Sequence, residues 1–222
     1  MTIRTRNHIY LGLHIVCSLF FIFNLILVIA RGSYLYARMP FGFDSGLAFY
    51  SFPAAVSGIL FFPLLGALVS FAIFRGFEKT PSMEITYFLG VILECIAESL
   101  RLMIPAFELG HSFSFLLVAV GRIVVAGRIA CVLSIFFASA FSSNEEIQNQ
   151  ERNLTIIIAS SCLCAFFYPV NTNVIEPFIM VQMGYRTFFI VIRFMVVAFS
   201  LVSMIQEAIA SGSRAYGTPS LG

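Results

Sequence analysis

The chain consists of long apolar runs separated by short polar segments. An α-helix needs about 20 mainly apolar residues to cross the hydrocarbon core of a bilayer. Six runs reach or approach this length, at about 8–30, 47–74, 85–107, 113–140, 154–170 and 185–208. The pattern predicts an all-α, polytopic transmembrane bundle of about six spanning helices within residues 1–210. The tail at 211–222 is rich in Ser and Gly and is expected to be disordered.

Cationic residues between the runs set the expected orientation. With the N-terminus in the cytoplasm, six of them lie on the cytoplasmic side: Arg4, Arg6, Arg75, Lys79, Arg152 and Arg214. Three lie on the opposite side: Arg31, Arg38 and Arg186. Because cytoplasmic loops carry an excess of Lys and Arg, this distribution predicts that both termini are cytoplasmic.

Some local features depart from a plain spanning helix. Pro53 and Pro63 each remove a backbone donor, so the second run is expected to be kinked or broken, either for packing or to line a site. Segment 174–183 is apolar but too short to span, which favours a re-entrant or interfacial piece, or a seventh membrane element. Gly121 and Gly127 are expected to allow close approach between helices.

Composition agrees with a lipid environment. Hydrophobic residues make up 59% of the chain and charged residues 11%, whereas a soluble domain carries about 25% charged residues. The net charge of +2 is too small to indicate nucleic-acid binding. Five cysteines lie in apolar runs without a Cys-x-x-Cys pair, which favours packing over disulfides or zinc: Cys17, Cys95, Cys131, Cys162 and Cys164.

Away from their ends, the predicted spans contain six charged residues. Glu94, Glu98 and Arg101 have a spacing of i, i+4, i+7, which places them on one face of the third run. The fourth and sixth runs carry the others: Arg122, Arg128 and Arg193. Each such charge costs about 2.5–3.5 kcal/mol on insertion scales when it sits at the centre of a spanning helix. We therefore expect all six to face the bundle interior or water.

Arginines outnumber carboxylates in this set by four to two, and arginine stays protonated when buried. The surplus predicts an outward-facing polar cavity whose arginines bind an anion: Arg101, Arg122, Arg128 and Arg193. Guanidinium groups suit carboxylate and phosphate. Glu94 and Glu98 would form ion pairs or couple a proton. In the competing interpretation, the pairs only clamp helices together, and the remaining arginines bind backbone carbonyls or lipid phosphates.

The sequence contains no recognisable motif for an enzyme, a cofactor, a metal ion or nucleotide hydrolysis. Three functions stay open. The first is a small transporter, or a substrate-binding membrane subunit, for an anionic solute. The second is a membrane sensor or interaction module that signals to a membrane or cytoplasmic protein partner through the polar connection 141–153. The third is an intramembrane enzyme that acts on lipid, with Glu94 and Glu98 as acid and base. Short connections, the absence of a cleavage site after the first run and the cysteine usage are typical of a bacterial inner (plasma) membrane protein.

Overall fold

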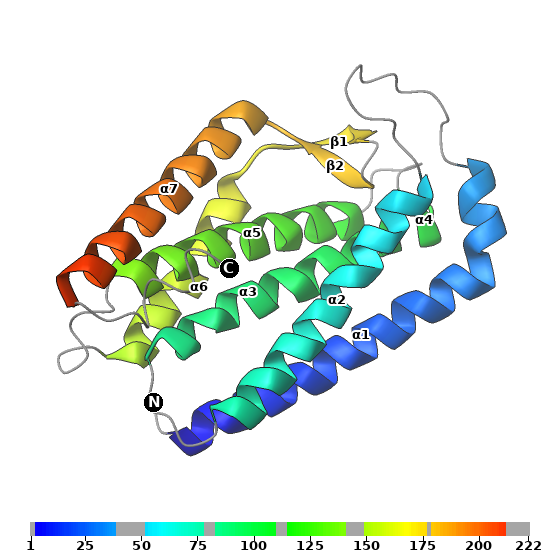
Figure 1. The fold of residues 1–222 in the computed structure, drawn as a ribbon. Helices are drawn as coiled ribbons and strands as arrows, with labels where there is room; N and C mark the ends of the chain where they lie inside the picture. The colour runs from blue at the N-terminus through cyan, green and yellow to red at the C-terminus, as the bar shows by residue number, and fades with distance from the viewer. Residues whose placement is uncertain are drawn as a thin grey trace.

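The structure, a computed structural model, describes residues 3–38, 52–77, 83–109, 115–140, 149–176 and 179–211. Over these residues the chain is predominantly helical (Figure 1). The long helices are α1 (Ile3–Arg38), α2 (Phe52–Gly76), α3 (Met83–Ser99), α5 (Phe115–Ala140), α6 (Gln150–Phe167) and α7 (Arg186–Ser211). After α3 the chain continues through a 3-10 turn, η1 (Leu100–Leu102), into the short α4 (Met103–Ala106).

The prediction of a predominantly helical chain is confirmed, and the prediction of membrane-spanning helices is supported by three candidate spans. Each predicted run is helical over most of its described length, while 47–51, 113–114 and the tail from 212 onward lie outside the described residues. Among the described helices, three stretches are long and apolar enough to cross a membrane: Ile3–Gly32, Pro53–Gly76 and Phe115–Ser139. A shorter apolar stretch covers Phe189–Ser203. The count of six spans and the cytoplasmic position of both termini stay predictions.

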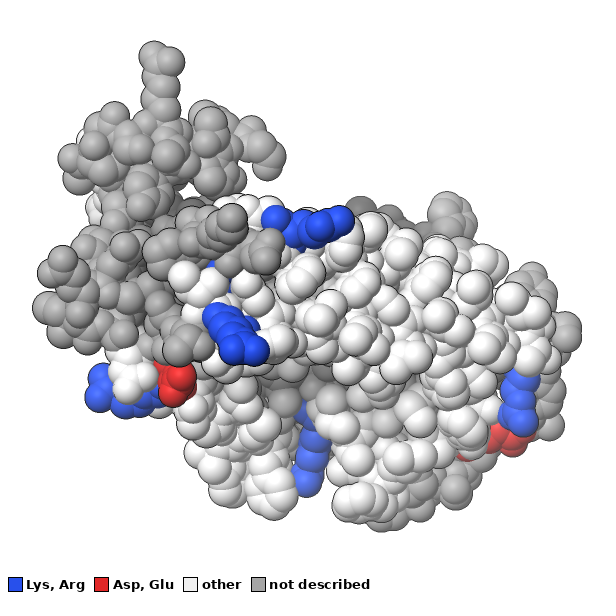
Figure 2. All heavy atoms as spheres, turned by 90° about the horizontal axis from the view of Figure 1, so that it is seen from below, with Lys and Arg blue, Asp and Glu red and all other residues white. Residues whose placement is uncertain are grey.

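The lateral surface of the bundle is apolar. Large hydrophobic side chains are exposed along the helices, for example Leu19, Leu68 and Phe194. Figure 2 shows one face on which the charged side chains of the described residues are few and most of the described surface is uncharged. A water-soluble protein rarely exposes apolar patches of such extent. Together with the three long apolar helices, this surface indicates an integral membrane protein.

Most helices pack against the helices next to them in the sequence, and α5 contacts both α6 and α7 (Figure 1). Polar side chains of α1 bind backbone carbonyls of the segment from α3 to α4 at a constant sequence offset. Tyr10 donates to Ile85, Asn24 donates to Ser99 over 3.0 Å, and Arg31 donates to Ala106 over 2.7 Å: each pair is 75 residues apart. The constant offset means that α1 and α3 run parallel.

The contact between α3 and α5 is the closest in the bundle. A Cβ atom added to Gly127 would lie 2.6 Å from Cβ of Ala97, and one added to Gly90 would lie 2.0 Å from Oγ of Ser134. The later residue of α3 meets the earlier residue of α5, so the two helices are antiparallel. Small residues let the backbones approach here, as expected for Gly127. At Gly121 the nearest side-chain atoms are at ordinary contact distance.

The second run is neither broken nor interrupted at its prolines. Pro53 lies in the first turn of α2, where a backbone N–H would have no helical partner. Pro63 lies inside α2, which continues as helix to Gly76. The expected break in this run is therefore absent from the structure.

The all-α prediction misses one element, an antiparallel hairpin of β1 (Val170–Glu176) and β2 (Met180–Met183). The hairpin contains the described part of the 174–183 segment, for which we expected a re-entrant or interfacial piece. This segment is apolar because the hairpin buries side chains in a cluster with residues of α4 and α5. The buried residues of the hairpin in this cluster are Ile179, Met180 and Val181. We call this end of the bundle the hairpin end.

Candidate functional site

The centre of the candidate site is Glu98 on α3, whose residue surface is only 2% exposed. Its Oε2 atom accepts a hydrogen bond from Nη1 of Arg101 over 2.6 Å, within the same helical segment. Its Oε1 atom pairs with Nε of Arg128 on α5. Each carboxylate oxygen thus binds a different arginine. This triplet joins α3 to α5 at the point where small residues bring their backbones close.

Arg101 extends the triplet to the hairpin. Its Nε atom donates to the backbone carbonyl of Ile179 over 3.3 Å. Ile179 is fully buried and has a φ of 57°, which is rare for a β-branched residue. The charged donor and the surrounding apolar contacts hold this strained turn in place.

Glu94 lies one helical turn before Glu98 on α3 and is half-buried. Its carboxyl group interacts with the thiol of Cys131 on α5, with Arg128 and with Arg193 on α7. Charges of alternating sign therefore run across three helices. We call these five residues the charge network: Arg101, Glu98, Arg128, Glu94 and Arg193.

Arg122 lies apart from this network. The guanidinium carbon of Arg122 lies 4.8 Å from the centroid of the Phe166 ring on α6. The Nε atom of Arg122 is buried without a hydrogen-bond acceptor. Within the described part of the chain, Arg122 forms no ion pair. It is the one arginine of the predicted set that approaches neither carboxylate.

The structure thus brings together five of the six residues predicted from the sequence. Helical geometry explains the exception, because Arg122 and Arg128 are six residues apart on α5 and point about 120° away from each other. Only Arg128 faces α3. Two partners were not foreseen. Cys131 follows Arg128 by three residues and lies on the same helix face, so the sequence could have indicated this contact. The backbone carbonyl of Ile179 could not have been foreseen, because every residue carries such a group.

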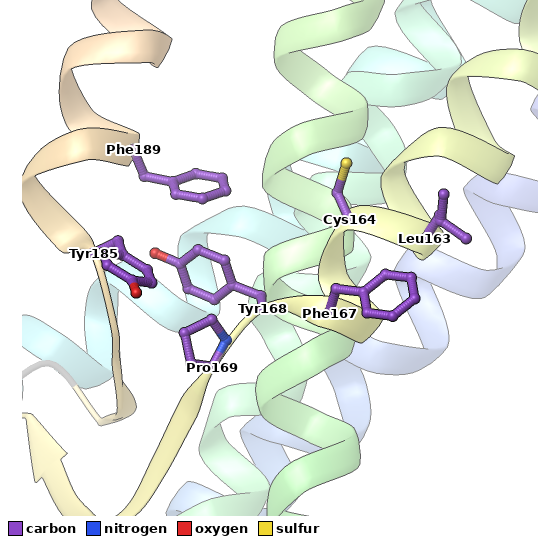
Figure 3. Close-up of a pocket in the computed structure, with 7 residues that line it drawn as sticks. All are labelled: Leu163, Cys164, Phe167, Tyr168, Pro169, Tyr185 and Phe189. Atoms are coloured by element: carbon purple, nitrogen blue, oxygen red, sulfur yellow. The ribbon is translucent and has the colours of Figure 1, made fainter.

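An apolar hollow of about 630 Å³ opens between α6 and α7 (Figure 3). Aromatic rings that precede and follow the hairpin in the sequence line it: Phe167, Tyr168, Tyr185 and Phe189. In Figure 3 the rings of Tyr168 and Phe189 approach each other across the opening, with their centroids 4.4 Å apart. The lining is almost wholly apolar, so this hollow is not the polar cavity expected around the arginines.

Comparison of the chain with models of protein families, with curated protein sequences and with solved structures finds no match in any of the three. Across the described ranges, no group of His, Cys, Asp and Glu side chains is arranged to hold a metal ion. The chemistry that the site offers therefore comes from its guanidinium, carboxyl and thiol groups.

Proposed function

We propose that the protein is a small membrane transporter, or a substrate-binding membrane subunit, that binds an anionic solute at the charge network. The network holds three guanidinium groups and two carboxylates, so one positive charge is left without a partner. Arginine does not release its proton inside proteins. A bound monoanion would neutralise the surplus and remove the cost of an uncompensated charge at bilayer depth.

The observation that carries this proposal is the position of Arg193 at the end of the network. Arg101 and Arg128 are both held by Glu98. Arg193 interacts electrostatically with Glu94, but no residue in the described ranges accepts a hydrogen bond from it. It is half-buried on α7. Its donors are therefore available for the two oxygens of a carboxylate or phosphate group.

Glu94 supplies a means of coupling solute binding to protons. It faces both Arg128 and Arg193, so its negative charge competes with an incoming anion. A proton on Glu94 removes that competition, and linkage requires that the anion in turn favours protonation. Under this proposal, solute and proton bind together, and a dianion then balances the two positive charges that remain in the network. Replacing Glu94 by Gln should tighten anion binding and abolish its pH dependence.

The two other functions lack a supporting observation. Residues 141–148 of the polar connection lie outside the described residues. The intramembrane enzyme would need both Glu94 and Glu98 to exchange protons, as acid and base. Glu98 is engaged on both oxygens by arginines, which is the geometry of an ion pair.

Thermal unfolding of the purified protein in detergent, with a panel of small carboxylates, phosphate and sulfate, tests the proposal. A ligand present at 100 times its Kd stabilises the folded state by about 2.7 kcal/mol. For a chain of this size that corresponds to a rise in Tm of about 5–10 °C. Arg193→Gln should remove the rise. Arg152→Gln, exposed in the first turn of α6, should preserve it.

Two results would contradict the proposed solute site. One is the absence of any shift across the whole panel. The other is an equal shift in the wild-type protein and in Arg193→Gln, which would place the anion away from the network.

A further inference from the structure

Arg122 is the arginine of the predicted set that approaches neither carboxylate, and its position along the membrane normal differs from that of the network. Helix α5 has 26 residues, about 39 Å of helix, against a hydrocarbon thickness of about 30 Å. With α5 centred, Cα of Arg122 lies about 6 Å inside the hydrocarbon boundary at the hairpin end. Helical side chains point towards the helix N-terminus, so Arg122 leans towards that boundary. An extended arginine side chain spans such a distance.

The contacts of Arg122 place its charge on the lipid-facing side of the bundle. The guanidinium lies over the ring of Phe166. Phe166 is the second-last residue of α6 and is 60% exposed. Ile123, the next residue of α5, is 47% exposed. The guanidinium is thus bordered by apolar surface that acyl chains contact, while its Nε donor is buried without an acceptor.

We infer that Arg122 and Phe166 form a phospholipid site at the hairpin end of α5 and α6, in which the guanidinium binds the headgroup phosphate and the acyl chains pack on Phe166 and Ile123. A phospholipid carries its phosphate at the hydrocarbon boundary, whereas a hydrated free anion would have to leave water to reach this surface. The lipid phosphate compensates the second of the two surplus arginine charges. This inference uses a different arginine and a different helix pair from the proposed solute site.

Native mass spectrometry of the delipidated full-length protein, titrated with a phosphatidylglycerol, tests the site. The wild-type protein should bind one lipid with an affinity about tenfold or more above that of Arg122→Gln, as expected for loss of hydrogen bonds to a charged group. Arg122→Lys keeps the charge but loses the planar fork, and should retain most of the binding. Arg152→Gln and Arg193→Gln should bind the lipid as the wild-type protein does.

Several outcomes would overturn the inference. Equal lipid affinity in Arg122→Gln and the wild-type protein would exclude Arg122 from the site. An equal loss in Arg193→Gln would show that the lipid occupies the network, and this would leave the solute site open to its own test. Displacement of the lipid by micromolar inorganic phosphate would show a free-anion site. If Arg122→Gln fails to fold, Phe166→Leu replaces it: weaker lipid binding supports the site, and unchanged binding overturns it.

Discussion

Arg128 and Arg122 lie on the same helix, six residues apart, yet they have opposite environments. Arg128 is near the middle of α5, faces α3 and pairs with Glu98. Arg122 is nearer the hairpin end, faces α6 and rests on an aromatic ring. We attribute the difference to the position of each arginine along α5 and to the helix face from which it extends. Near the midplane no lipid phosphate is within reach, whereas close to the boundary a lipid can supply the negative charge.

The seam between α3 and α5 adds a second contrast. Gly127 directly precedes Arg128, and its Cα faces Ala97, which directly precedes Glu98. Gly127 and Ala97 let the two backbones come close, and the ion pair of Glu98 with Arg128 lies directly beside this contact. At Gly121, which precedes Arg122, an added Cβ atom would lie at ordinary contact distance from Val170 and Val181 of the hairpin. Within the described residues, the α3–α5 contact thus combines close backbone approach with an ion pair.

Of the substitutions that distinguish the two regions, Glu98→Gln should lower the free energy of unfolding most. The change leaves Arg101 and Arg128 without a carboxylate at bilayer depth, which should lower the free energy of unfolding by about 3–5 kcal/mol. Unfolding in mixed micelles measures the loss. Glu151→Gln, exposed in the first turn of α6, is the matched control and should cost less than about 1 kcal/mol. A loss for Glu98→Gln as small as that of the control would mean that the pairs contribute little.

Gly127→Ala should have the next largest effect. The new Cβ would lie 2.6 Å from that of Ala97, so α3 and α5 must separate, at a cost of about 1–3 kcal/mol. Ala97→Gly in the same chain makes room and should recover most of the loss. Gly58→Ala, where a Cβ would meet nothing within 4 Å, should not destabilise the protein. If Ala97→Gly does not restore stability, the close contact between α3 and α5 is not the cause of the loss in Gly127→Ala.

The sequence predicted most of the helices because the length of an apolar run is a direct consequence of bilayer thickness. It also placed Glu98 and Arg101 on one helix face, since residues three apart are neighbours on a helix. The hairpin was missed because a short apolar segment fits a strand as well as a helix. The separation of Arg122 from the other charges depends on which helix packs on each face of α5. A single sequence does not encode that choice in any local pattern.

The most direct test of the division between the two regions is a pair of double-mutant cycles on the free energy of unfolding. One combines Glu98→Gln with Arg128→Gln, and the other combines Glu98→Gln with Arg122→Gln. A direct ion pair predicts a coupling energy of about 2–3 kcal/mol in the first cycle, and independent sites predict additivity within about 0.5 kcal/mol in the second. Equal coupling of Glu98 to both arginines would contradict this account, because it would mean that Arg122 interacts with Glu98 as strongly as Arg128 does.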